Sequence, residues 1–211
     1  MDTIRLIEML AGDKRQWPPD PTFALRRATG LAIALAAAII FLTLSIRPDL
    51  AIVAKTPGFA WKLAATVSLG VSAFGLVLRV SRPGDEWRLA AANLTVAPMV
   101  LAMGIASDFL PRSAILSSVS TNPNGFVCLA SIVLAGLAPF GIIVAALRQG
   151  APTNPALAGA VAGLLAGGIA ATFFIAHCVS DSLLFVATWY TLASVTLAAL
   201  GAAVALRLVR W

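Results

Sequence analysis

The chain has 211 residues, of which 60% are hydrophobic and only 11% charged, and its mean hydropathy is +0.93. Soluble globular domains carry about 25% charged residues, so this composition excludes an ordinary soluble domain and predicts a polytopic membrane protein. The net charge of +6 does not indicate direct nucleic-acid binding, because the Lys and Arg residues are spread along the edges of apolar runs.

The N-terminal segment is the only sizeable polar part of the sequence. Ile4, Ile7 and Leu10 recur at helical spacing and Gly12 follows as a stop signal, which predicts a short amphipathic helix. A proline-rich linker comes next, and it cannot continue the helix because proline lacks the amide donor. We therefore expect residues 1–28 to form a soluble helix and linker, separate from a membrane domain at 29–211.

Six apolar runs fill the rest of the chain, and their lengths suit bilayer-crossing helices of about 17–25 residues. The second run is short, but Trp61, Lys62 and Arg79 can extend it by interfacial anchoring. The sequence thus predicts an all-α fold with six transmembrane helices. The runs are 30–46, 63–78, 89–107, 126–147, 156–176 and 183–206.

Basic residues divide unevenly between the two ends of these helices, with eleven on the side of the N-terminus and four on the other. Because cytoplasmic loops are enriched in Lys and Arg, both termini are expected in the cytoplasm and the connections 47–60, 108–125 and 177–182 outside. The four outer basic residues are Arg47, Lys55, Lys62 and Arg112.

Small residues and prolines indicate how the helices pack. Gly159, Gly163 and Gly167 recur at every fourth position of the fifth run, so a neighbouring backbone can approach that face closely. We expect packing within the chain, with self-association as the alternative. Pro98 and Pro139 are expected to kink the third and fourth spans, where neighbouring groups meet the freed carbonyls.

The two cysteines, Cys128 and Cys178, are predicted at the same outer membrane surface. Cys128 lies just inside the outer end of the fourth run and Cys178 just beyond the outer end of the fifth. A reversible disulfide, a sulfenic acid or thiolate binding of a soft metal are all available to such a pair. A static disulfide or two inert buried side chains are the structural alternatives.

His177, the one histidine of the chain, precedes Cys178. Its imidazolium can lower the pKa of that thiol, or its neutral ring can complete a metal site with Cys128, Cys178 and Asp181. The plain alternative is a histidine that lies at the membrane interface. These four possible metal ligands lack a paired-cysteine motif, so the sequence alone does not decide between the interpretations.

Polar residues inside the spans are scarce. No Asp, Glu, Lys, Arg or His occupies the interior of any run, which disfavours ion-coupled transport and intramembrane hydrolysis. We therefore expect no enzyme and no cofactor. Asp181 and Ser182 are predicted to cap the sixth helix, and Trp189 and Tyr190 to be packing aromatics.

The chain resembles the NrsF-like family of six-span bacterial membrane anti-sigma factors. The resemblance covers almost the whole chain, and its most specific part runs from His177-Cys178 through Asp181-Ser182 to Trp189-Tyr190. Thr3-Ile4-Arg5-Leu6-Ile7 at the start, the basic proline-rich approach to the first span, and Cys128 complete it. Val179 stands where proline is expected in relatives, which leaves the local loop shape open.

The resemblance implies a protein of the bacterial inner membrane that sequesters an extracytoplasmic-function sigma factor at its cytoplasmic face. It gives Cys128 and Cys178 the role of sensing an oxidant or heavy metal, and it gives His177 and Asp181 no established role beyond auxiliary candidates. The sigma-binding face is expected to consist of Ile4, Leu6, Ile7 and Leu10. A small transporter or pore and a passive scaffold are the alternatives, and the oligomeric state is left open.

Overall fold

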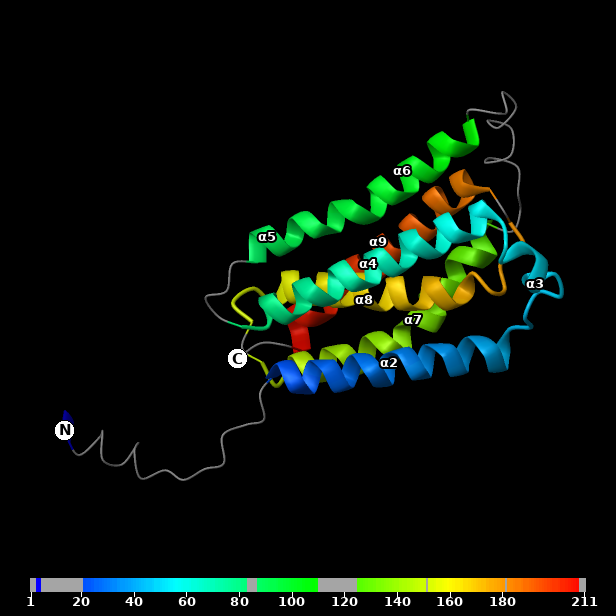
Figure 1. Cartoon of the computed structure of the whole chain (residues 1–211). Helices are drawn as coiled ribbons and strands as arrows, with labels where there is room; N and C mark the ends of the chain where they lie inside the picture. Colours follow the sequence, from blue (N-terminus) through cyan, green and yellow to red (C-terminus); the bar gives the residue numbers. More distant parts are fainter. Residues whose placement is uncertain are drawn as a thin grey trace.

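The computed structural model describes residues 3–4, 21–82, 87–109, 125–150, 152–180 and 182–208, and all regular secondary structure in them is helical. Six helical segments are long and apolar enough to cross a membrane, and Figure 1 shows the long helices running alongside one another. This confirms the predicted all-α, six-span fold. The elements are α2 (Pro21–Thr43), α3 (Leu50–Val53), α4 (Pro57–Val80), α5 (Trp87–Ala92), the 3₁₀ turn η1 (Asn93–Thr95), α6 (Val96–Phe109), α7 (Gly125–Leu147), α8 (Pro155–Phe174) and α9 (Leu183–Leu208).

Polar caps and prolines set where several helices begin. The Thr56 hydroxyl accepts a hydrogen bond from the Phe59 amide (3.4 Å) at the start of α4, and the Asn154 side chain accepts one from the Leu157 amide (3.1 Å) at the start of α8. A proline follows each cap at the first helical position, where no amide donor is needed. Ser182 accepts from the Phe185 amide (3.4 Å), as predicted for the start of α9.

α2 begins at Pro21, well before the predicted start of the first span at residue 30. Leu25 and Ala28 are buried against the bundle, while Arg26 and Arg27 are exposed on other faces of the same helix. The helix therefore continues outward past the apolar run on which the sequence prediction was based.

α8 is the most buried of the six spans and packs against α2, α4, α7 and α9. Its glycine face lies on α9, as predicted for packing within the chain. A Cβ at Gly159 would overlap the Gly201 carbonyl, and one at Gly163 would overlap the Leu197 carbonyl. Side chains are excluded at these positions because the two backbones are in direct contact.

The third span consists of α5, η1 and α6, and the 3₁₀ turn ends at Thr95, three residues before Pro98. Pro98 has no amide to pair with the carbonyl of Leu94, which lies in that turn, so the helix is interrupted where the sequence predicted a distortion. Pro139 lies buried inside α7. The third span is the least buried of the six and lies along one side of the bundle (Figure 1).

The buried side chains form two apolar clusters, one toward each end of the bundle. The cluster near the end of α8 contains both cysteines together with Ile132, Phe174 and Phe185. Because α7 and α8 are consecutive and antiparallel, the first turn of α7 lies beside the last turn of α8. The fold therefore places Cys128 and Cys178 at the same end of the molecule.

Candidate functional site

Two buried thiols form the centre of the candidate site. Cys128 lies in the first turn of α7, and Cys178 lies four residues beyond the end of α8. Their sulfur atoms are 4.0 Å apart, and both cysteines are free. The predicted proximity of the two side chains is thus present without a covalent bond, since a disulfide needs about 2.05 Å between the sulfurs.

The loop that carries Cys178 leaves α8 through a tight turn. The backbone amides of His177 and Cys178 both donate to the Phe174 carbonyl, each at 3.0 Å. A shared acceptor is common at a helix terminus, where the last carbonyls lack helical partners. This turn directs the Cys178 side chain back into the apolar cluster beside Cys128.

A buried arginine holds the Cys178 loop from the α2 side. The Arg47 guanidinium donates to the Cys178 carbonyl (3.0 Å), and the Arg47 amide donates to the Ala176 carbonyl (3.2 Å). Asp49 accepts two further hydrogen bonds from Arg47, each at 2.7 Å. The same guanidinium holds the pKa of the Asp49 carboxyl below its usual value.

A buried lysine holds the loop from α4. Lys62 is only 4% exposed, and its Nζ donates to the Ser180 carbonyl at 2.5 Å. The sequence predicts Arg47 as a marker of membrane topology, and Lys62 as both such a marker and an interfacial anchor of the second span. Their role in fixing the cysteine loop was missed, because the partners are backbone carbonyls more than a hundred positions away in the chain.

The surroundings of Cys178 favour its thiolate. A hydrogen bond from the Cys128 thiol lowers the pKa of Cys178 to about 6, against the opposing effect of burial. The Tyr190 hydroxyl, the Ser180 backbone and, to a smaller extent, the positive charge of Lys62 act in the same direction as Cys128. The cation that contributes is Lys62. A thiolate is the nucleophilic and metal-binding form of cysteine, so this thiol is prepared to react near neutral pH.

A cavity of about 340 Å³ borders both thiols. Cys128 and Cys178 line it together with Val127, His177 and Ser180, among others. Small reagents therefore have space beside the sulfur atoms although the side chains are buried.

His177 is half-buried, and its Nδ1 donates to the Ser45 carbonyl at 2.7 Å. Its ring also packs on Phe174, with 5.5 Å between the ring centroids. No group of three His, Cys, Asp or Glu side chains that could hold a metal ion occurs among the described residues. Asp181 lies outside those residues.

The aromatic residues of α9 pack around the site, as predicted. Trp189 makes an edge contact with Phe126 (6.1 Å between centroids), and Tyr190 packs against Phe174 (6.0 Å). A Cβ at Gly125 would overlap the Trp189 ring, so the first turn of α7 fits closely against α9. These contacts fix the position of Cys128 relative to the bundle.

Of the predicted sigma-binding face, Ile4 is described, in helical conformation and 73% exposed. Leu6, Ile7 and Leu10 lie outside the described residues.

Fold and site together define a class of protein: a six-span helical membrane protein with two free thiols side by side at one end of its bundle. The chain matches the family described as "Negative regulator of sigma F" (NrsF) over residues 10–211, and it belongs to that family. The resemblance drawn from the sequence is thereby confirmed.

Two curated relatives match over their full length. The chain is 32% identical over 218 residues to the anti-sigma-F factor NrsF of Caulobacter vibrioides (strain NA1000 / CB15N), covering 100% of both chains. It is 31% identical over 216 residues to the probable anti-sigma-F factor NrsF of Azospira oryzae (strain ATCC BAA-33 / DSM 13638 / PS), again covering 100% of both. No solved structure gives a significant match.

Proposed function

We propose that the chain is an anti-sigma factor of the bacterial inner membrane that releases its sigma factor when its two cysteines are modified. The observation that carries the proposal is the pair of free thiols 4.0 Å apart beside a cavity, in a chain whose full-length relatives are named anti-sigma factors. The partner is proposed to be an extracytoplasmic-function sigma factor, and both termini are proposed to lie in the cytoplasm, in agreement with the distribution of basic residues.

The sigma factor is proposed to bind residues 1–28, with Ile4, Leu6, Ile7 and Leu10 docking into a groove on its surface. Burying four such side chains contributes about 6–12 kcal/mol gross. Association costs of about 4–15 kcal/mol offset much of this gain. The helix therefore needs further contacts from the proline-rich linker or from the cytoplasmic loops.

The proposed oxidative signal is a hydroperoxide. The Cys178 thiolate attacks one peroxide oxygen and breaks the O–O bond, which gives a sulfenic acid and, after protonation of the leaving group, water or an alcohol. The Cys128 sulfur then attacks the Cys178 sulfur, so that a disulfide forms and a water leaves. The sulfurs must approach each other by about 2 Å for this bond to form.

A soft divalent metal is the other proposed signal. Two thiolates that bind one tetrahedral ion at about 2.3 Å lie roughly 3.8 Å apart, close to the observed 4.0 Å. Metal binding displaces the proton of Cys128 and any proton that remains on Cys178, and it needs almost no change in sulfur separation. The metal therefore leaves the sulfur separation almost unchanged, whereas the peroxide shortens it, although both signals require the same two cysteines.

The proposed route to the cytoplasmic side runs through α2. The Cys178 loop is tied by Arg47 to the segment that follows α2, and the first residues of α2 belong to the proposed sigma-binding segment 1–28. A shift of this loop favours release only if sigma binding differs between the two states, as any ligand-driven change requires.

Replacing Cys128 and Cys178 together by Ser tests the sensing half of the proposal. Serine is close to cysteine in shape and keeps a hydrogen-bonding group, so the bundle and sigma binding should be retained while the response to peroxide and cadmium is lost. Co-purification measures sigma binding, and a reporter gene under a sigma-dependent promoter measures release. A double variant that still responds would refute thiol sensing.

Ile7→Asp tests the binding half, with Glu8→Gln as the matched control on the neighbouring position. A buried aspartate without a partner is costly, so Ile7→Asp should release the sigma factor and switch the reporter on without inducer. Glu8→Gln should leave repression intact. If the intact protein co-purifies with no sigma factor at all, a scaffold or pore function replaces the proposal.

A further inference from the structure

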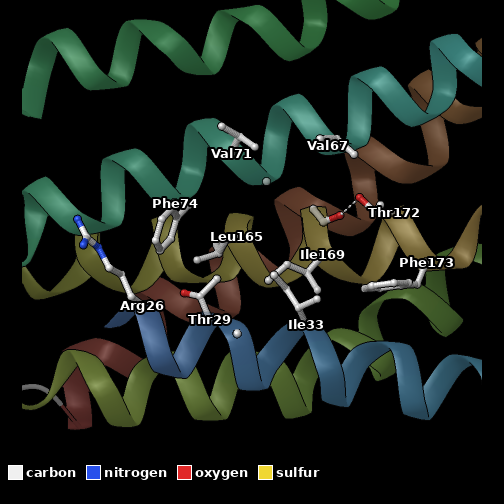
Figure 2. A pocket seen from close by; sticks show the side chains of 13 residues that line it. Arg26, Thr29, Ile33, Val67, Val71, Phe74, Leu165, Ile169, Thr172 and Phe173 are labelled. Atoms are coloured by element: carbon white, nitrogen blue, oxygen red, sulfur yellow. Dashed lines mark hydrogen bonds between the residues drawn. The ribbon is translucent and has the colours of Figure 1, made fainter. Parts of the chain in front are cut away.

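A second cavity lies on the side of the bundle and shares no lining residue with the cavity beside the thiols. It has a volume of about 430 Å³ and is bounded by α2, α4 and α8. α2 and α4 each pack against α8, and the cavity is the groove between them, as Figure 2 shows. We call it the lateral groove; its walls and floor include Ile33 of α2, Val67, Val71 and Phe74 of α4, and Leu165 and Ile169 of α8.

Glycines keep the lateral groove open. A Cβ at Gly168 would lie 2.9 Å from the Gly70 amide nitrogen, so α8 and α4 touch along the floor. On the groove side, a Cβ at Gly30 or at Gly70 would meet nothing within 4 Å. The space beside Gly30 and Gly70 is therefore open, because neither residue has a side chain.

The lining of the groove suits a hydrocarbon. Its two hydroxyl groups are already bonded within their own helices, Thr29 to the Leu25 carbonyl (2.8 Å) and Thr172 to the Gly168 carbonyl (2.7 Å). Neither hydroxyl group therefore requires a polar ligand. All three helices are membrane spans, so the medium around the groove is the bilayer.

One charged residue, Arg26, lies at one end of the groove beside Phe74, while Val67 and Phe173 lie at the other end (Figure 2). Arg26 is close to the start of α2, where a long basic side chain can reach the headgroup region. Among the residues that the structure describes, no carboxylate pairs with it. A phosphate group is the anion that the membrane surface offers.

The length of the groove matches one leaflet. From Leu165 to Phe173, α8 rises about 12 Å at 1.5 Å per residue. Half of a hydrocarbon core of about 30 Å is roughly 15 Å. A single acyl chain that enters beside Arg26 would therefore lie in the groove over most of the thickness of one leaflet.

We propose that the lateral groove binds one acyl chain of a membrane phospholipid whose phosphate is held by Arg26. The bound chain contacts three helices at once, which gives it more van der Waals contact than a lipid on a flat helix surface has. This site is independent of the thiol pair and of the sidedness of the protein.

The test uses the full-length protein in vesicles of phosphatidylcholine and phosphatidylglycerol that contain a trace of phosphatidylglycerol with a photoactivatable acyl chain. After irradiation, mass spectrometry locates the labelled residues. Labels should concentrate on the groove-lining parts of α2, α4 and α8. Even labelling of all lipid-facing helices would show ordinary annular lipid and overturn the proposal.

Gly70→Leu fills the groove, and Gly75→Leu is its matched control on the same helix, because Gly75 also has nothing within 4 Å but does not line the groove. Gly70→Leu should reduce groove labelling by about tenfold or more, since a filled apolar pocket rejects a ligand of that shape. Gly75→Leu should not. Both changes favour the helix, so folding is retained.

Arg26→Gln tests the phosphate contact independently, with Arg27→Gln as its control. Arg27 stacks over Phe23 (5.6 Å to the ring centroid) and does not line the groove. Arg26→Gln should lower the groove labelling several-fold, and Arg27→Gln should leave it unchanged. Crosslinks between two copies of the chain through the groove would identify a second copy as the occupant and would overturn the lipid proposal.

Discussion

Cys178 is the residue whose chemistry depends most on its neighbours. Because its pKa is lowered to about 6, alkylation by iodoacetamide should be independent of pH above neutrality and should fall about tenfold per pH unit well below pH 6. Peptide mapping of the native protein in detergent, at a series of pH values, measures this profile. A midpoint near the ordinary thiol pKa of about 8.5 would contradict it.

The matched variants at Cys128 separate the hydrogen bond from the general environment. Cys128→Ala removes the donor that lowers the pKa of Cys178, so the alkylation profile should move to higher pH. Cys128→Ser keeps a donor at the same place and should move the profile less. Equal profiles in the two variants would assign the effect to Tyr190, to the Ser180 backbone or to Lys62 instead.

Lys62 supports the Cys178 loop through a single buried ammonium group. Lys62→Met keeps the aliphatic stem but leaves the Ser180 carbonyl without this donor, which should cost about 1–3 kcal/mol. Thermal unfolding in detergent measures the loss. Lys55→Met is the control, because Lys55 is exposed near the same end of the bundle and its replacement should be close to neutral. A Lys62 variant as stable as this control would show that the contact contributes little.

At the scale of elements, the contact between α8 and α9 depends on the absence of side chains at the glycine face. Gly163→Ala places a methyl group against the Leu197 carbonyl, so the two helices must separate, at a cost of about 1–3 kcal/mol. Gly141→Ala on α7 meets nothing within 4 Å and should stabilise the helix by up to about 1 kcal/mol. Opposite shifts of the two unfolding temperatures are expected, and a neutral Gly163→Ala would refute direct backbone contact.

The helices and their packing could be predicted from the sequence further than the site could. Apolar length fixes the spans, and the spacing of Gly159, Gly163 and Gly167 indicated a close neighbour before the neighbour was known. The early start of α2 was missed because Arg26 and Arg27 end the apolar run without ending the helix. A hydrophobicity pattern records where the bilayer ends and says little about how far a helix extends into water.

The cysteine pair was predictable for the same reason as the spans, since counting helices places both thiols at one end. The supports from Arg47 and Lys62 were not, because each donates to a carbonyl whose position depends on how the loop after α8 is folded. A basic residue at a membrane edge has the same sequence signature whether it binds lipid, water or a backbone oxygen. Only the folded chain distinguishes these cases.

At the scale of the whole molecule, the proposed function requires the thiols outside and the sigma-binding segment inside. The two ends of the bundle can be compared with one cysteine each, in a chain whose native cysteines are replaced by Ser. Lys55 and Gln149 are both exposed, and they lie at opposite ends: Lys55 just before α4 and near the thiol end, Gln149 in the connection between α7 and α8. They therefore form a matched pair for labelling.

Lys55→Cys should react with a membrane-impermeant maleimide added to intact spheroplasts, and Gln149→Cys should react only after the membrane is permeabilised. The expected difference follows from the eleven basic residues on the side of Gln149 and of the N-terminus against four on the side of Lys55. Denatured samples of both variants must label equally, so that the difference reports access. The reverse pattern would place Cys128 and Cys178 in the cytoplasm and the N-terminal segment outside, where no sigma factor is present, and the proposed function would fail.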